Sequence, residues 1–425
     1  MTALSWLPTA PWLSAARGAN LVSADGTLGT TIFEEMTSLA VRHDAINLGQ
    51  GFPDQDGPDV IRELAREAIS RGENQYAPGK GITPLREAIA EHQGRFYGLA
   101  VDPADGVVVT TGATEAIAAA VLAFVEPGDE VVTFEPFYDS YGAMIALAGG
   151  VHRTVPLLAP DFQPDLDRLE EAFGPRTRMV LLNNPHNPCG SVFGEEVLDR
   201  IVELAARHNA VIVSDEVYEH LTFDVPHVPI ATRPGAFERT LTISSAGKTF
   251  SFTGWKVGWL SGPAELVTAA RTVKQFLSYS SGTPFQGAVA AALRLNDGQY
   301  HGFAAELQRK RDLLSEGLNA AGFTVYRPQG TYFVTVDAAP LGFDDALILA
   351  RELPERIGVA AIPLSVFCHE AGARSTASLL RFAFCKQETV LQEAATRLGQ
   401  LSEALNSGAQ NSGTLSSGTQ GPCHS

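Results

Sequence analysis

The chain has 425 residues, of which 45% are hydrophobic and 19% are charged. That length suggests two or three domains, and the composition excludes a collagen, a coiled coil and a wholly disordered chain. The formal net charge of −17 repels phosphate backbones, so we expect no nucleic-acid partner.

The cysteines and the apolar runs exclude two further classes. No Cys-x-x-Cys pair occurs, so the sequence predicts neither a zinc site nor a disulfide framework, and we expect a metal-free protein of the reducing cytoplasm. The longest plain apolar run, Ala116 to Val125, is too short to cross a bilayer, which needs about 20 residues. The N-terminus has no basic residue before Arg17, so it is a poor signal peptide, and we expect no membrane partner.

The first half of the chain alternates strands with helices. Residues 1–28 have no sustained periodicity and predict a loosely held extension. The apolar run 107–111 predicts a buried strand, followed by an Ala-rich helix over 114–125 and a second strand over 130–134. Further strands are expected over 179–183, 210–214 and 240–244, with a helix over 195–208. This order predicts an α/β fold with a mostly parallel sheet covered on both faces.

The order of the predicted elements changes near residue 300. A charged helix over 304–320 precedes predicted strands at 323–326, 332–336 and 379–384, which indicates a smaller α+β domain. The last residues, 406–425, form a near five-residue repeat of Asn, Ser and Gly without charged side chains, which predicts a disordered tail.

A lysine and an aspartate follow two of the predicted strands. Lys248 lies among small residues in Ser244-Ser-Ala-Gly-Lys248, and Lys256 follows it. Lys248 is either a surface lysine of a turn or a nucleophile that forms an imine with an aldehyde cofactor, activated by a lowered pKa. Asp215 is either a helix N-cap or the partner of a protonated pyridine nitrogen, with the Tyr218 phenol near a ring oxygen.

Three other segments also end strands. Gly112 opens a turn into a helix whose first N–H groups suit a phosphate. The run Asn183-Asn-Pro-His-Asn187 projects amide side chains from an irregular loop, and Tyr138 is either a core aromatic or a ring that stacks on a flat ligand. Strand ends of a parallel sheet meet at one edge, so we expect these groups to converge. A nicotinamide site lacks its Gly-x-Gly-x-x-Gly, and a Walker A loop lacks its first glycine because position 242 is Thr.

These motifs together resemble those of fold-type I pyridoxal-phosphate aminotransferases of class I. The resemblance runs in order from about residue 30 to 405 and also includes Asn47-Leu-Gly-Gln-Gly-Phe-Pro-Asp54, Asn74-Gln-Tyr76 and Leu380-Arg-Phe382. The resemblance implies a large cofactor domain with a seven-stranded sheet over 58–298, a small domain over 299–405, and an arm over 29–57 that joins the small domain.

The resemblance also implies roles for individual residues. Lys248 would hold pyridoxal 5'-phosphate and then act as the general base, Asp215 would face the pyridine nitrogen, and Asn187 and Tyr218 would face the ring 3-oxygen. Tyr138 would stack on the ring. The phosphate would bind the turn residues Gly112, Ala113 and Thr114, together with Ser245 and Lys256. Arg381 would bind the substrate α-carboxylate, helped by Asn183 and Gly51.

The partner and the substrate are implied in the same way. Tyr76 would reach the phosphate of a neighbouring subunit, which implies a homodimer. The motifs look most like those of N-succinyldiaminopimelate aminotransferases, so the expected reaction uses N-succinyl-LL-2,6-diaminopimelate and 2-oxoglutarate in lysine biosynthesis. Kynurenine, glutamine or methionine transamination and a cysteine-conjugate β-lyase activity remain the alternatives.

Overall fold

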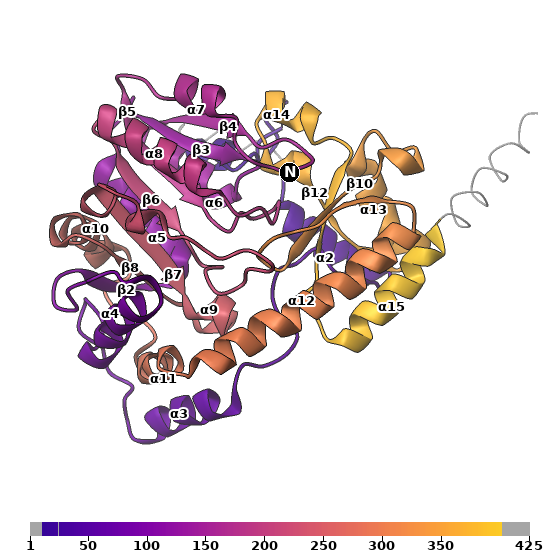
Figure 1. Ribbon diagram of the computed structural model, residues 1–425. Coiled ribbons are helices and arrows are strands. Elements are labelled where there is room, and N and C mark those ends of the chain that lie inside the picture. Colours follow the sequence, from indigo (N-terminus) through magenta and orange to yellow (C-terminus); the bar gives the residue numbers. More distant parts are fainter. Residues whose placement is uncertain (1–10, 24, 402–425) are drawn as a thin grey trace, which may run out of the picture.

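A seven-stranded sheet forms the centre of the computed structural model, which describes residues 11–23 and 25–401 (Figure 1). Its strand order is β2-β8-β7-β6-β5-β3-β4. Within this sheet, β8 is antiparallel to both its neighbours and the other pairings are parallel. The strands are β2 (Val107–Thr111), β3 (Glu130–Glu135), β4 (Val151–Pro156), β5 (Thr177–Asn183), β6 (Val211–Asp215), β7 (Thr240–Ser245) and β8 (Val257–Ser261). The predicted mostly parallel sheet is therefore confirmed.

Successive side chains of a strand point to opposite faces of the sheet, so the two faces of this sheet pack in different hydrophobic cores. Val213 of β6 belongs to a core with α5 (Gly112–Phe124), α6 (Asp139–Leu147) and α10 (Ala264–Leu277). Its neighbour Ile212 belongs to a second core with α7 (Leu166–Ala172) and α8 (Glu195–Arg207). A third core lies around β2 and β8, and it includes α3 (Asp59–Ser70), α4 (Thr83–Tyr97) and α11 (Thr283–Leu293).

A smaller four-stranded sheet of order β12-β13-β10-β9 carries the later part of the chain. Its strands are β9 (Thr324–Tyr326), β10 (Phe333–Asp337), β12 (Ile362–Pro363) and β13 (Leu379–Ala383), and its pairings are antiparallel. Its core includes residues of α2 (Ile32–Arg42), α12 (Asp297–Ala320), α13 (Ala346–Ile357) and α15 (Glu388–Gly399). The remaining α-helices of the described residues are α1 (Pro11–Gly18) and the short helices α9 (Ala246–Thr249) and α14 (Glu370–Ser375).

A two-stranded parallel sheet ties the N-terminal arm to this smaller layer. In it, β1 (Ile46–Asn47) pairs with β11 (Val359–Ala360). The arm that the resemblance implied over 29–57 remains a proposal, and this pairing is the contact on which it rests. The domain limits 58–298 and 299–405 remain a proposal, since α12 begins at Asp297 and runs from one layer to the other (Figure 1).

The structure differs from the predicted elements in several places. The helix predicted from residue 114 begins at Gly112, and the helix predicted from 304 begins at Asp297, where the Asn296 side chain caps it. Strands β1, β4, β8, β11 and β12 were absent from the prediction. Within the extension 1–28, helix α1 packs against α6 so closely that a Cβ on Gly18 would lie 2.2 Å from the Gly142 carbonyl oxygen. The predicted tail 406–425 lies outside the described residues.

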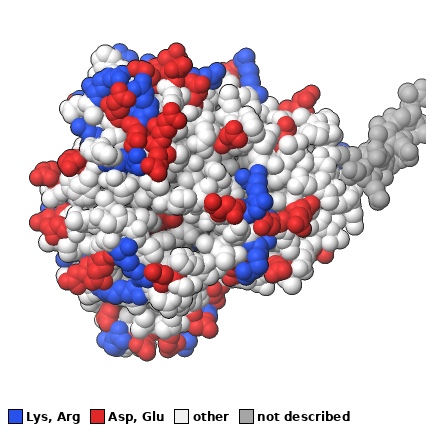
Figure 2. Space-filling model, in the orientation of Figure 1, with Lys and Arg blue, Asp and Glu red and all other residues white. Residues whose placement is uncertain are grey.

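Charges are intermixed on the face of the molecule drawn in Figure 2, and the middle of that face is mainly uncharged. The net charge of −17 therefore does not collect into one acidic patch on this face. Among the helices of residues 11–23 and 25–401, none has both the length and the apolar character needed to cross a membrane.

Candidate active site

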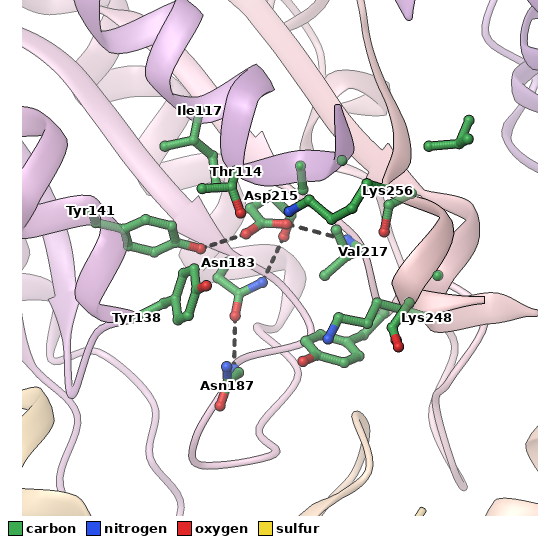
Figure 3. A pocket seen from close by; sticks show the side chains of 17 residues that line it. Thr114, Ile117, Tyr138, Tyr141, Asn183, Asn187, Asp215, Val217, Lys248 and Lys256 are labelled. Atoms are coloured by element: carbon green, nitrogen blue, oxygen red, sulfur yellow. Dashed lines mark hydrogen bonds between the residues drawn. The ribbon is translucent and has the colours of Figure 1, made fainter. Parts of the chain in front are cut away.

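A pocket opens where β2, β5, β6 and β7 end, and it collects most of the residues predicted from the sequence (Figure 3). Its empty volume is about 780 Å³, part of which is open to solvent. The predicted residues that line it are Gly112, Ala113, Thr114, Tyr138, Asn183, Asn187, Asp215, Tyr218, Ser245, Lys248 and Lys256. The motifs that follow the strands therefore converge on one pocket, as the sequence predicts.

Asp215 is the last residue of β6 and lies at the centre of the pocket (Figure 3). Its Oδ2 accepts a hydrogen bond of 2.6 Å from the Tyr141 hydroxyl, and its Oδ1 accepts one of 3.4 Å from the Val217 N–H. Burial raises the pKa of Asp215 to about 6, because a carboxylate loses solvation there and these hydrogen bonds only partly compensate. The site therefore favours a cationic ligand group beside Asp215.

Lys248 extends from α9 toward the smaller sheet. Its Nζ donates a 2.8 Å hydrogen bond to the Tyr332 hydroxyl, which in turn donates to the Gly51 carbonyl over 2.6 Å. Burial lowers the pKa of Lys248 to about 8, because the ammonium form loses solvation. An amine with this pKa is partly neutral at physiological pH, which is the nucleophilic form.

The turn at the start of α5 forms an anion cradle. Gly112 has φ 71°, in the region that favours glycine, and the first backbone N–H groups of α5 follow it. Gly258 makes room for this turn, since a Cβ there would lie 2.8 Å from the Ala113 nitrogen. Lys256 Nζ would lie 3.3 Å from a Cβ on Gly112, so an ammonium stands beside the same turn.

Arg381 lies on β13 next to the pocket and does not line it directly. Its Nη1 donates to Asn187 Oδ1 over 3.0 Å and its Nη2 donates to the Gly49 carbonyl over 2.7 Å. The guanidinium lies 4.0 Å over the Phe333 ring and is almost fully buried, and its Nε has no partner among the described residues. Burial lowers the pKa of Arg381 to about 10, yet the guanidinium is still a cation at neutral pH.

Three predicted residues have surroundings that differ from their expected roles. Both polar ends of the Asn183 amide are used within the chain, because Nδ2 donates to the Asp215 carbonyl and Oδ1 accepts from the Asn187 N–H, each over 2.8 Å. The Gly51 carbonyl accepts from Tyr332. Tyr76 is 81% exposed, contacts Tyr279 edge-on and does not line the pocket of its own chain.

Two tyrosines whose hydroxyl groups hydrogen-bond to predicted site residues were not themselves predicted. Tyr141 lies three residues after Tyr138 at the start of α6, and that helical spacing would have indicated it. Tyr332 reaches Lys248 from the other layer, and the sequence carries no local signal for such a contact.

The chain matches the family model "Aminotransferase class I and II" over residues 43–398. It is 50% identical to the probable N-succinyldiaminopimelate aminotransferase of Mycobacterium tuberculosis, with 88% of this chain and 96% of the relative covered. It is 42% identical to the methionine aminotransferase of Escherichia coli, with the same coverage. The solved structure of N-succinyldiaminopimelate aminotransferase from Mycobacterium tuberculosis superposes with a TM-score of 0.85 at 51% identity, covering 88% of this chain and 97% of that one.

These similarities confirm the resemblance drawn from the motifs, including the fold-type I architecture. Each similarity covers both the seven-stranded sheet and the smaller layer, so the chain resembles these proteins over its whole fold and not in one domain only. The chain is therefore an enzyme that belongs to the class I and II aminotransferases.

Proposed function

We propose that the pocket holds pyridoxal 5'-phosphate, as the family implies. The observation that carries the proposal is that an amine, a carboxylate and an anion cradle surround one cavity, at Lys248, Asp215 and the start of α5. Lys248 would bind the aldehyde covalently, Asp215 would pair with the pyridinium nitrogen, and Lys256 and Ser245 would hold the phosphate with the α5 N–H groups. The bound cofactor supplies an electron sink for the bond broken at the substrate Cα.

The remaining polar groups fit the ring and the substrate. Tyr218 and the amide nitrogen of Asn187 would donate to the ring 3-oxygen, and Tyr138 would stack on the ring. Arg381 keeps N–H donors beyond those bound to Asn187 and Gly49, and these would bind the substrate α-carboxylate with the help of the Gly51 backbone. Since both polar ends of Asn183 are used, we propose that it positions Asn187 rather than binding substrate.

Proton transfer falls to Lys248. Its lowered pKa suits an amine that takes a proton from the substrate Cα and returns it elsewhere near neutral pH. Tyr332 would orient the amine between these events.

Borohydride reduction of the yellow holoenzyme tests the attachment of the cofactor. The reduced cofactor should be recovered on a peptide that contains Lys248. Recovery on a peptide containing Lys256 or Lys274 would overturn the assignment.

We infer that the active unit is a homodimer in which Tyr76 completes the phosphate site of the neighbouring subunit. Tyr76 contacts Tyr279, which is 40% exposed, and two residues shortly before Tyr279 in the chain are also exposed, Phe276 at 86% and Leu277 at 47%. An exposed apolar group of this kind supports contact with a second copy.

The proposed reaction is amino transfer between N-succinyl-LL-2,6-diaminopimelate and 2-oxoglutarate, in the reducing cytoplasm. The 50% identity to the probable N-succinyldiaminopimelate aminotransferase supports this donor over methionine, since the methionine aminotransferase is 42% identical. Kynurenine and glutamine transamination and β-lyase activity remain secondary candidates.

A donor panel tests the substrate. With 2-oxoglutarate as acceptor, the succinylated donor should exceed kynurenine, glutamine and methionine by at least about tenfold in kcat/KM, or roughly 1.4 kcal/mol. A higher value for methionine or kynurenine would reject the substrate and leave the aminotransferase assignment intact.

A further inference from the structure

Two imidazoles and a carboxylate converge away from the active-site pocket. His92 lies on α4, and Glu219 and His220 follow β6 in the turn beyond Tyr218. One ligand atom from each of the three side chains lies within 4.8 Å of the others. Within residues 11–23 and 25–401, no other group of three His, Cys, Asp or Glu side chains converges in this way. None of the three lines the pocket around Lys248.

The two imidazoles face each other through the same ring atom. His92 Nε2 and His220 Nε2 are 2.6 Å apart, and the ring planes are inclined at 82°. Two lone pairs cannot face each other at this distance without a proton or a cation between them. In the metal-free chain one imidazole therefore donates its Nε2–H to the Nε2 lone pair of the other. A metal ion would replace that proton, and the two nitrogens would move apart to the separation that two Zn–N bonds of about 2.0–2.1 Å require.

The carboxylate has an unused oxygen at this place. Glu219 is only 4% exposed, and its Oε1 accepts a 2.5 Å hydrogen bond from the Ser244 hydroxyl. Neither its Oε2 nor the hydroxyl of the neighbouring Tyr97 makes a hydrogen bond of normal geometry among the described residues. A buried carboxylate oxygen without a partner is costly, and a cation bound to it removes the cost.

A neighbouring amide can set the tautomer that metal binding needs. Gln93 Nε2 lies 3.5 Å from His92 Nδ1, and Gln93 Oε1 has no partner among the described residues. With the amide rotated by half a turn, that oxygen would accept the Nδ1–H of His92. The Nε2 lone pair would then point at the metal, as it does in most histidine metal sites.

We propose that His92, Glu219 and His220 bind one divalent transition-metal ion of the zinc class, with water as the fourth ligand. Two imidazoles and one carboxylate form a ligand set that Zn²⁺ takes in proteins. The sequence did not predict this site, because 128 residues separate His92 from His220 and no short ligand motif exists. The ion would tie α4 to the segment that carries Asp215 and Tyr218, so its role would be structural.

Zinc titration of the tag-free holoenzyme tests the site. The enzyme is treated with a chelator, dialysed, and equilibrated with Zn²⁺ alone, and bound zinc is measured by atomic emission. We expect one zinc per chain and a rise in the melting temperature. Glu219→Gln, which keeps the shape of the side chain, and His220→Gln should each bind zinc at least about tenfold more weakly.

A second histidine pair supplies the matched control. His152 Nδ1 and His369 Nε2 are 3.0 Å apart, yet no third ligand converges on them. His152→Gln should therefore bind zinc as the wild type does. Absence of zinc binding in the wild type, or binding that persists unchanged in both Glu219→Gln and His220→Gln, would overturn the proposal.

Discussion

Lys248 Nζ lies 2.8 Å from the hydroxyl oxygen of Tyr332, so a residue next to β10 holds the amine presented by α9. The hydroxyl uses its own proton to reach the Gly51 carbonyl, over 2.6 Å. It therefore can only accept from Lys248. This geometry fixes the direction in which the Tyr332 hydroxyl shifts the pKa of the amine.

Tyr332→Phe should lower the pKa of Lys248 below the value of about 8, because the ammonium form loses a hydrogen bond. The neutral amine is present above the pKa, so it would then persist to lower pH. We expect the rate at which the cofactor-free protein takes up pyridoxal phosphate to rise with pH, with a lower midpoint in the variant. We also expect kcat to fall about tenfold, or roughly 1.4 kcal/mol.

Tyr326→Phe on β9 is the control for this change, since it removes a hydroxyl remote from Lys248 in the same small sheet. It should leave the uptake profile in place. An unchanged midpoint in Tyr332→Phe would show that the contact does not tune the amine.

Asp215→Asn should separate activity from stability. The folded pKa of about 6 exceeds the ordinary value of 3.8, so ionisation of this carboxyl opposes folding. Ionisation of Asp215 therefore lowers the free energy of unfolding. This loss is absent below about pH 4 and complete above about pH 6, where it reaches about 3 kcal/mol for a pKa difference of about two. Without cofactor, the variant should therefore unfold at higher urea than the wild type at pH 8, and at similar urea at pH 4.

Turnover of the same variant should fall on the order of 10²–10³, as losses of one fixed electrostatic partner do. The exposed acid Asp167 on α7 gives the control, because Asp167→Asn should change neither property. Near-normal turnover in Asp215→Asn would show that Asp215 has a structural role only.

Tyr76→Phe should weaken cofactor binding by about tenfold if the phenol binds phosphate across the dimer. Mixing these subunits with Lys248→Ala subunits creates hybrids with one intact site and one doubly altered site. Cofactor bound at the intact site should dissociate as slowly as from the wild type. The neighbouring aromatic Tyr279 offers a matched change, and Tyr279→Phe should have no such effect. If light scattering shows a monomer and that monomer is fully active, the shared site is refuted.

Arg381→Lys should reduce kcat/KM for every amino donor by at least about 100-fold, or roughly 2.7 kcal/mol. A lysine cannot reproduce the flat guanidinium over Phe333 or serve Asn187, Gly49 and a carboxylate together. Arg356→Lys on α13 replaces a surface ion pair with Glu352 and should leave the kinetics alone. Donor-dependent losses would argue that Arg381 contacts the side chain instead.

The predictable part of the site is the part built from strand ends. Asp215, Lys248 and Gly112 each follow a recognisable apolar strand, and parallel strands bring such ends together without further information. The contact of Tyr332 with Lys248 and the convergence of the three residues of the proposed metal site arise from the packing of separate layers and helices. Local sequence patterns do not encode that packing. Strand β8 went unpredicted for a separate reason, since Gly258 interrupts its apolar run and weakens the pattern of a buried strand.

The loop after β1 serves both Arg381 and Tyr332 through main-chain oxygens, those of Gly49 and Gly51. A mutational scan that trims side chains leaves both acceptors untouched, so it would pass over this loop. Gly51→Ala would respond for a separate reason, because its new methyl group would meet the Phe333 ring at 2.2 Å. Only a change in loop length or a backbone ester substitution would expose the contribution of these carbonyls.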